Sequence, residues 1–186
     1  MVEYERFHPR TRAEWRGWLE THHDHSPGVW VVTWRTGAAR PRLGYEDLVE
    51  EALCFGWIDS RAKRLDDERS MITMTPRRPG SVWSRSNKER VERLVAQGRM
   101  APAGLRAIEV ARANGAWEAL DDVDNLVLPD DLRNALEAVE RARAQFDGWT
   151  ASRKKMTLYW IKSAKRPETR ARRIAETVRS AADNGR

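Results

Sequence analysis

Residues whose types and spacing could support chemistry are concentrated in one stretch of the sequence, residues 54–89. Two segments with alternating apolar and polar residues, 57–65 and 70–76, predict a β-hairpin within it. A strand period of two and a matching register predict one polar face, formed by Trp57, Asp59, Arg61, Lys63, Thr73 and Thr75. Such a face can receive an anionic or peptide ligand, because arginine donates two parallel hydrogen bonds to a carboxylate. The solvent-facing side of an ordinary antiparallel sheet shows the same pattern.

A second polar cluster follows the hairpin, immediately before a predicted helix. It consists of Arg77, Arg78, Trp83, Ser84, Asn87 and Lys88. Helix N-termini present unpaired N–H groups and the positive end of the helix dipole, which attract anions. The alternative is internal capping by Ser84 or Ser86, with Trp83 as a core residue. We predict a ligand-binding pocket beside the hairpin, lined by Trp57, Asp59, Arg61, Arg77, Arg78, Trp83, Ser84, Asn87 and Lys88.

Other residues with catalytic or metal-binding potential have weaker support. Cys54, the only cysteine, lies on the apolar side of a predicted helix, which favours a buried and unreactive thiol. The histidine-rich segment 22–25 has no second group of ligands elsewhere, so its spacing does not indicate a metal site. The sequence has no glycine-rich phosphate loop, nucleophile elbow or zinc-protease motif. We therefore expect no metal and no cofactor, and a binding protein rather than an enzyme; an enzyme that uses Cys54 or Asp59 is the alternative.

Charge is unevenly distributed along the 186 residues. The segment from Arg153 to the end has a balance of +8, whereas the rest of the chain is close to neutral and the total is +6. This basic segment indicates either a solvated helix face or a site that binds nucleic acid. Nucleic-acid binding through the C-terminal helices is therefore our alternative prediction of function. The first ten residues have no apolar signal-peptide core, and the longest apolar run, 29–32, is far shorter than the roughly 20 residues of a membrane span. We expect a cytoplasmic protein without a transmembrane segment.

Apolar periodicity predicts the elements that position these residues. A buried strand is expected over 29–34, and helices are expected to begin at Thr11, Ser86, Pro102, Pro129, Thr150 and Pro167. The helix from Thr150 is expected to turn Met156, Tyr159 and Trp160 inward. The predicted fold class is α+β, with a small, mainly antiparallel sheet of about three strands followed by an all-helical C-terminal half. The acidic segment 121–124 is interpreted as a loop that divides an α+β core, 1–120, from a helical region, 121–186, packed on it or appended to it.

Short motifs in this order resemble the YdeI/OmpD-associated family of bacterial proteins. They are Cys54 to Ser60, Thr75 to Arg78, Ser81 to Ser84, Asn87-Lys88, Gly98 to Met100, Pro102 to Gly104, Ala164 to Arg166 and Glu168 to Arg170. The resemblance extends over nearly the whole chain. It implies a stress-protection role in tolerance of bacteriocins or cationic antimicrobial peptides. It also implies an outer-membrane porin as the protein partner. It implies no reaction and no catalytic residues. The one local departure is Ala101, at a position where a Ser or Thr helix cap is expected.

Overall fold

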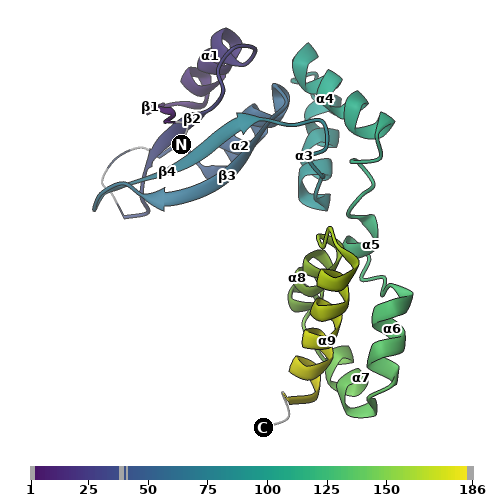
Figure 1. Cartoon of the computed structure of the whole chain (residues 1–186). Coiled ribbons are helices and arrows are strands. Elements are labelled where there is room, and N and C mark those ends of the chain that lie inside the picture. Colours follow the sequence, from purple (N-terminus) through teal and green to yellow (C-terminus); the bar gives the residue numbers. More distant parts are fainter. Residues whose placement is uncertain (1–2, 38–39, 41, 184–186) are drawn as a thin grey trace. The chain divides into compact units, whose positions relative to one another are not determined.

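The structure is a computed structural model that describes residues 3–37, 40 and 42–183. The chain divides into two compact units, residues 1–118 and 119–186, and each is described by itself. The division into two domains at residue 120 stays a prediction. The first unit contains β1 (Glu5–Phe7), α1 (Arg12–His22), β2 (Val29–Trp34), α2 (Tyr45–Cys54), β3 (Trp57–Arg64), β4 (Arg69–Pro76), α3 (Arg85–Ala96) and α4 (Pro102–Ala113), as Figure 1 shows.

The predicted hairpin is confirmed as β3 and β4, and it belongs to a sheet with the strand order β1-β2-β4-β3. Strand β1 pairs parallel to β2, and the other two pairs are antiparallel. The mixed class with a sheet in the N-terminal half is therefore confirmed, but the described residues form four strands rather than about three. Strand β1 is only three residues long, and two of them, Glu5 and Arg6, are charged. Its place in the sheet comes from backbone pairing with β2, which no side-chain pattern reveals.

A β-bulge in β3 changes which side chains share a face of the sheet. Asp59 pairs with Met74 and Ala62 pairs with Ile72, so β3 has one more residue than β4 over this span. An extra residue shifts the alternation of all the residues that follow it. Asp59 therefore lies on the face of Met74, whereas Lys63 lies on the opposite face. The prediction of a single polar face containing both Asp59 and Lys63 is wrong for this reason.

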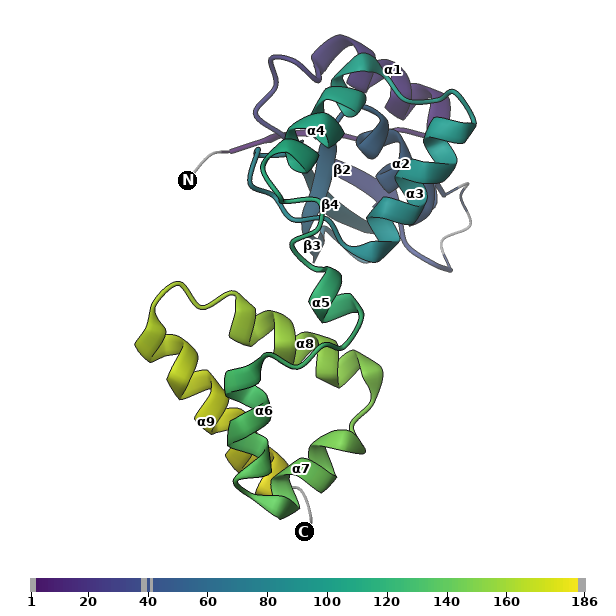
Figure 2. The ribbon, with the colours of Figure 1, turned by 90° about the vertical axis from the view of Figure 1, so that its right-hand side faces the viewer.

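One face of the sheet packs against all four helices of the first unit, which lie in front of the sheet in Figure 2. Five of the nine tryptophans are buried in this core, and they are Trp15, Trp18, Trp57, Trp83 and Trp117. Two of their indole N–H groups donate to backbone oxygens, from Trp15 to Leu48 at 3.0 Å and from Trp57 to His23 at 3.1 Å. Large aromatic side chains stabilise the core, and these bonds satisfy the only polar atom that each ring buries.

Helix starts follow the predicted capping residues with one exception. The Thr11 hydroxyl accepts a hydrogen bond from the backbone N–H of Glu14 at 3.1 Å, and the Thr150 hydroxyl likewise caps its helix. Helix α3 begins at Arg85 and its cap is Ser84, so the prediction that Ser86 opens this helix is wrong. Both serines precede apolar residues at helical spacing, and only the backbone geometry distinguishes them.

The second unit is helical, as predicted for the C-terminal half. It contains α5 (Asp121–Asp124), α6 (Asp130–Glu137), α7 (Glu140–Asp147), α8 (Ala151–Lys162) and α9 (Pro167–Asp183). Its core includes Leu132, Leu136, Phe146, Leu158 and Ile161. The acidic segment forms a single helical turn, α5, rather than a loop. None of the described helices is long and apolar enough to cross a membrane.

Helix α8 faces its core with residues other than those predicted. Leu158 and Ile161 are buried, whereas the side chains expected inside are among the exposed apolar ones, with Met156 at 69%, Tyr159 at 48% and Trp160 at 37% exposure. The helix carries apolar residues on two sides, so its periodicity favours neither. Contact with the neighbouring helices α5 and α9 decides which side is buried.

Candidate functional site

A cavity of about 350 Å³ lies where the end of β4 meets α4. The backbone N–H of Arg77 donates to the carbonyl of Gly56 at 2.9 Å, which extends the hairpin pairing to the turn between α2 and β3. We call this space the Arg77 cavity, and it is lined by Phe55, Gly56, Arg77, Arg78, Pro79, Trp83, Ala103, Arg106, Ala107, Val110 and Ala111. Small residues on α4 leave the room for it. The cavity joins an apolar wall to three arginine side chains.

The guanidinium of Arg77 contacts an aromatic ring with its flat face and donates a hydrogen bond from one of its three nitrogens. Its central carbon lies 3.6 Å from the centre of the Trp83 ring, and its Nη1 donates to the carbonyl of Val82 at 3.3 Å. Its Nε and Nη2 are shielded from solvent and have no hydrogen-bond partner among the described residues. These two nitrogens form the side-on edge of the guanidinium, which can donate two parallel hydrogen bonds to one carboxylate. The strongest recognition edge of Arg77 is therefore unpaired.

The cavity is positively charged, because its lining contains three arginines and no acidic residue. Burial lowers the pKa of Arg77 to about 10, and the attraction of Asp59 offsets only part of this effect. Arg77 is still protonated at neutral pH. Within the described part of the chain, neither Arg78 nor Arg106 forms an ion pair. An anion is the complementary ligand for this space.

The structure brings three of the nine predicted pocket residues together, Arg77, Arg78 and Trp83. Trp57 is a core residue with 1% exposure, and the Asp59 carboxylate accepts a hydrogen bond from the hydroxyl of Tyr45 on α2 at 2.9 Å. Burial of the Tyr45 hydroxyl raises its pKa to about 12, and the hydrogen bond to Asp59 contributes to the same increase. Arg61 lies at a separate hollow on the other face of the sheet.

The remaining three predicted residues belong to α3 and its cap. The Ser84 hydroxyl accepts from the backbone N–H of Asn87 at 3.4 Å, and the Asn87 side chain accepts from Arg90 at 3.0 Å. The Lys88 ammonium lies 5.5 Å from the centre of the Trp117 ring. These contacts do not bring the three side chains to the Arg77 cavity. Arg106, which does line it, was missed, although its place among Ala103, Gly104 and Ala107 marks a closely packed helix face.

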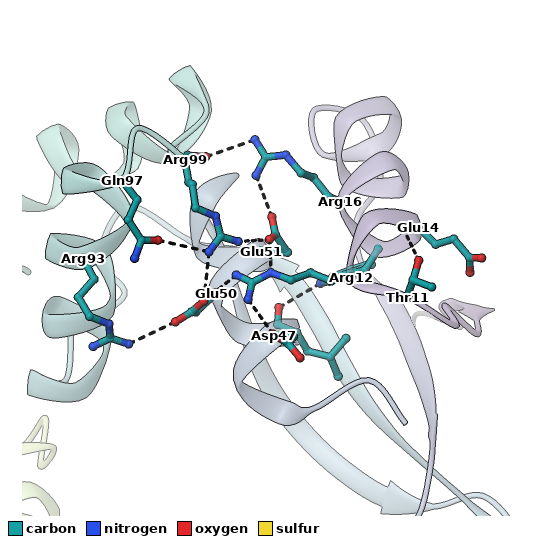
Figure 3. Close-up of polar contacts among 12 residues, drawn as sticks. Thr11, Arg12, Glu14, Arg16, Asp47, Glu50, Glu51, Arg93, Gln97 and Arg99 are labelled. Atoms are coloured by element: carbon teal, nitrogen blue, oxygen red, sulfur yellow. Dashed lines mark hydrogen bonds and ion pairs between the residues drawn. The ribbon is translucent and has the colours of Figure 1, made fainter. Parts of the chain in front are cut away.

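A cluster of ion pairs around Glu51, shown in Figure 3, was not predicted from the sequence. Glu51 on α2 has 1% exposure, and its carboxylate forms ion pairs with Arg12 at 2.6 Å, with Arg16 at 2.8 Å and with Arg99. Burial alone would raise the pKa of Glu51, but the hydrogen bonds from Arg12 and Arg16 lower it. Glu50 beside it pairs with Arg12 at 2.6 Å and with Arg93 at 3.2 Å, so both carboxylate oxygens of Glu51 and both of Glu50 are engaged. The cluster ties α1, α2 and the segment after α3 together.

A sequence signal for this cluster exists, because Glu51 falls on the same helical stripe as the apolar Leu48 and Ala52. A charge at a core position requires a partner. Cys54, one turn further along α2, is buried, and burial raises the pKa of its thiol. The His22 ring stacks on Trp18 with a centre-to-centre distance of 4.5 Å. The Nδ1 atom of His22 also lies 2.8 Å from the backbone oxygen of Trp18, so this histidine is engaged within α1.

Two protein-family models match the chain. A model described as a domain of unknown function, DUF8412, matches residues 7–107, which is more than half of the chain. The chain belongs to the DUF8412 family. A second model, described as "Bacteriocin-protection, YdeI or OmpD-Associated", matches residues 125–184. No curated protein and no solved structure matches the chain.

These matches confirm the resemblance to the YdeI/OmpD-associated family and correct its extent. The match covers the helical second unit and not nearly the whole chain. Most of the residues that line the Arg77 cavity, and most of the motifs that suggested the resemblance, lie in the region matched by the DUF8412 model. The hint of bacteriocin protection therefore comes from the second unit, and the candidate binding site belongs to the DUF8412 unit.

Proposed function

We propose that this chain is a non-enzymatic binding protein whose Arg77 cavity holds a small organic anion. The observation that carries the proposal is the side-on edge of Arg77, which is shielded from solvent and unpaired within the described residues. A carboxylate or phosphate can accept two parallel hydrogen bonds from this edge. Each bond removes the cost of a buried donor without a partner, which is about 1–3 kcal/mol.

The cavity wall indicates what kind of anion fits. Trp83 and Phe55 provide aromatic surface, and the alanines of α4 leave a compact space beside them. Arg78 and Arg106 add positive charge without a competing carboxylate. A compact ligand with an apolar part and one anionic group matches this lining, and the carboxylate end of a peptide is one example. To bind it, the Arg77 side chain turns its unpaired edge toward the cavity.

The second family match supports a biological setting for this binding protein. The matched family is described by bacteriocin protection and OmpD association. We infer a stress-protection role in the bacterial cytoplasm, in which the chain raises tolerance of bacteriocins or cationic antimicrobial peptides. The anion site and this role are separate parts of the proposal, because they rest on different units of the chain.

The anion site is tested with Arg77→Met and Arg77→Lys variants in thermal unfolding experiments. Benzoate, phosphate and a dipeptide with a free carboxylate serve as probes. We expect at least one probe to raise the Tm of the unmodified protein in a saturable way, because a ligand that binds only the folded state stabilises it. Both variants should lose this shift, since lysine keeps the charge but lacks the two-nitrogen edge. Arg35→Gln, at an exposed position outside the cavity, is the control and should keep the shift.

The same variants distinguish a binding residue from a structural one. Arg77→Met removes a buried charge that has no carboxylate partner, and the desolvation cost that it relieves offsets the lost contacts with Trp83 and Val82. Without ligand, Arg77→Met should therefore change the free energy of unfolding by less than about 1 kcal/mol. A large loss of stability together with no probe-dependent shift in any variant would show that Arg77 only supports the fold. The protective role is tested separately, by comparing the peptide tolerance of a deletion strain with that of the same strain complemented with the unmodified protein.

A further inference from the structure

The sheet of the first unit has a second face, opposite to the one that packs against helices α1–α4 (Figure 2). Cross-strand partners point to the same side of a sheet, so the register identifies the residues on this face. Arg6 of β1 pairs with Trp30 of β2, and Trp30 pairs with Thr73 of β4. Lys63 of β3 lies on the same side through its pairing with Met71. We call this side the open face.

The open face is hollowed, and the hollow has a volume of about 550 Å³. Its floor is formed by the almost completely buried Thr73 and Met71, with exposures of 5% and 3%. The walls carry two aromatic rings, Tyr4 and Trp30. This size lies within the range of small-molecule and cofactor pockets, roughly 300–1,000 Å³. The hollow is part of the sheet surface and is separate from the Arg77 cavity.

Three basic side chains, Arg6, Arg61 and Lys63, surround the hollow, against one acidic residue, Glu3. None of these three cations forms an ion pair with a residue in the described part of the chain. The Lys63 ammonium instead lies 4.6 Å from the centre of the Trp30 ring. Arg61 and Lys63 are two residues apart and line the same hollow, and the β-bulge places them on the face opposite to that of Asp59. Unpaired cations grouped around aromatic rings attract a ligand that is both anionic and flat.

We propose that the open face binds single-stranded nucleic acid. Phosphate groups pair with Arg6, Arg61 and Lys63, and a base stacks on the ring of Trp30 once a phosphate draws the Lys63 ammonium away from it. Aromatic rings within a basic groove are the general means of holding unpaired strands, because every base has a flat π-face. An acidic peptide would engage the cations but would leave the aromatic rings without a partner. This site and its ligand go beyond the anion cavity proposed above and do not depend on it.

The test measures binding of a fluorescein-labelled thymidine oligonucleotide, about 12 nucleotides long, by fluorescence anisotropy over a salt series. Contact with about three phosphates predicts a slope of log affinity against log salt near −2. The Arg61→Gln/Lys63→Gln variant should make this slope less steep, lowering its magnitude by about 1.4. Trp30→Leu should weaken binding by about tenfold, since the loss of one stacked base has an effect of this order. Trp30→Phe should retain most of the affinity because it keeps an aromatic face.

A double variant with the same loss of charge, Arg141→Gln/Arg179→Gln, is the matched control, since both arginines are exposed side chains of the second unit. It should leave the affinity unchanged to within about twofold. Circular dichroism of every variant confirms that it is folded. The proposal is overturned by no binding at low salt, by Trp30→Leu binding as well as the unmodified protein, or by the control weakening binding as much as Arg61→Gln/Lys63→Gln. Equal affinity for duplex DNA of the same length, or for thymidine monophosphate, also overturns it.

Discussion

At the scale of single residues, Glu51 carries the most consequential polar contacts of the described chain. Its carboxylate is almost completely buried and pairs with Arg12, Arg16 and Arg99 from two different parts of the first unit. The pKa of Glu51 is lowered by Arg12 and Arg16 against the opposing effect of burial. A carboxyl group whose pKa is lower in the folded state stabilises the fold above its unfolded pKa. That stabilisation is lost as the pH falls through the folded pKa.

We therefore expect the free energy of unfolding to decrease as the pH falls below about 4.5, the ordinary value of a Glu carboxyl. Glu51→Gln should cost about 3 kcal/mol at neutral pH, because it leaves buried arginine donors without their charged partner. It should also flatten the acid part of the stability profile. Urea unfolding between pH 3 and pH 7 measures both effects, with the pH range chosen around the ordinary carboxyl value.

Glu20→Gln is the matched control for this prediction. Glu20 pairs with the same Arg16 at 3.2 Å, but its side chain is 55% exposed. Exposed ion pairs contribute about 0–1 kcal/mol, so this variant should remain within that range and keep the acid profile. Equal effects of the two substitutions would contradict the special role of Glu51.

At the scale of elements, the contact between α2 and α4 sets the position of one wall of the Arg77 cavity. The backbone N–H of Ala101 donates to the carbonyl of Cys54 at 3.0 Å, so the start of α4 lies against the end of α2. A Cβ atom at Gly104 would lie 2.2 Å from the same carbonyl oxygen. Only glycine permits this approach. Helix α4 begins without a side-chain cap at Ala101, and Pro102 in its first turn has no N–H group that needs a partner.

Gly104→Ala should lower the free energy of unfolding by about 1–3 kcal/mol, because the added methyl group forces α4 away from α2. Intrinsic helix propensity predicts the opposite sign, a gain of about 1 kcal/mol. Gly17→Ala on α1 separates the two effects, since nothing lies within 4 Å of its added Cβ atom. That variant should be stabilised. Thermal and urea unfolding of both variants checks the prediction, and a stabilised Gly104→Ala protein would contradict the close approach.

At the scale of the whole molecule, the described residues form two apolar cores that share no residue. One core contains Leu19 and belongs to the first unit, and the other contains Leu136 and belongs to the second. Hydrophobic stabilisation is local to the residues that bury each other. Each core should therefore stabilise its own unit.

We expect Leu136→Ala to destabilise the second unit by about 3 kcal/mol and to leave the first unit largely unaffected. Hydrogen exchange measured by mass spectrometry should show faster exchange of residues 119–183 and unchanged exchange of helices α1–α4. Leu19→Ala should give the reverse pattern. Val139→Ala, at a position with 39% exposure, is the surface control. Loss of protection in both units from either core substitution would show that the chain unfolds as one cooperative domain.

Features that depend on neighbouring residues follow from the sequence alone. The hairpin, most helix starts, the helical C-terminal half and the candidate Arg77 all follow from alternation, capping residues and glycine or proline positions. The basic C-terminal segment is likewise a property of the sequence alone. These signals are local because they arise from backbone geometry within a few residues. They predicted the class of the fold and one part of the candidate site.

Which of these residues come into contact depends on how the elements pack in three dimensions. The bulge in β3 separated Asp59 from Lys63, and backbone pairing added β1 to the sheet. Helix packing left Trp160 outside its core and placed Arg106 beside Arg77. The Glu51 cluster joins residues 35 to 48 positions apart, which no periodic pattern can indicate. Long-range contacts depend on the register and packing of whole elements, and a side chain's neighbours are known only when those are known.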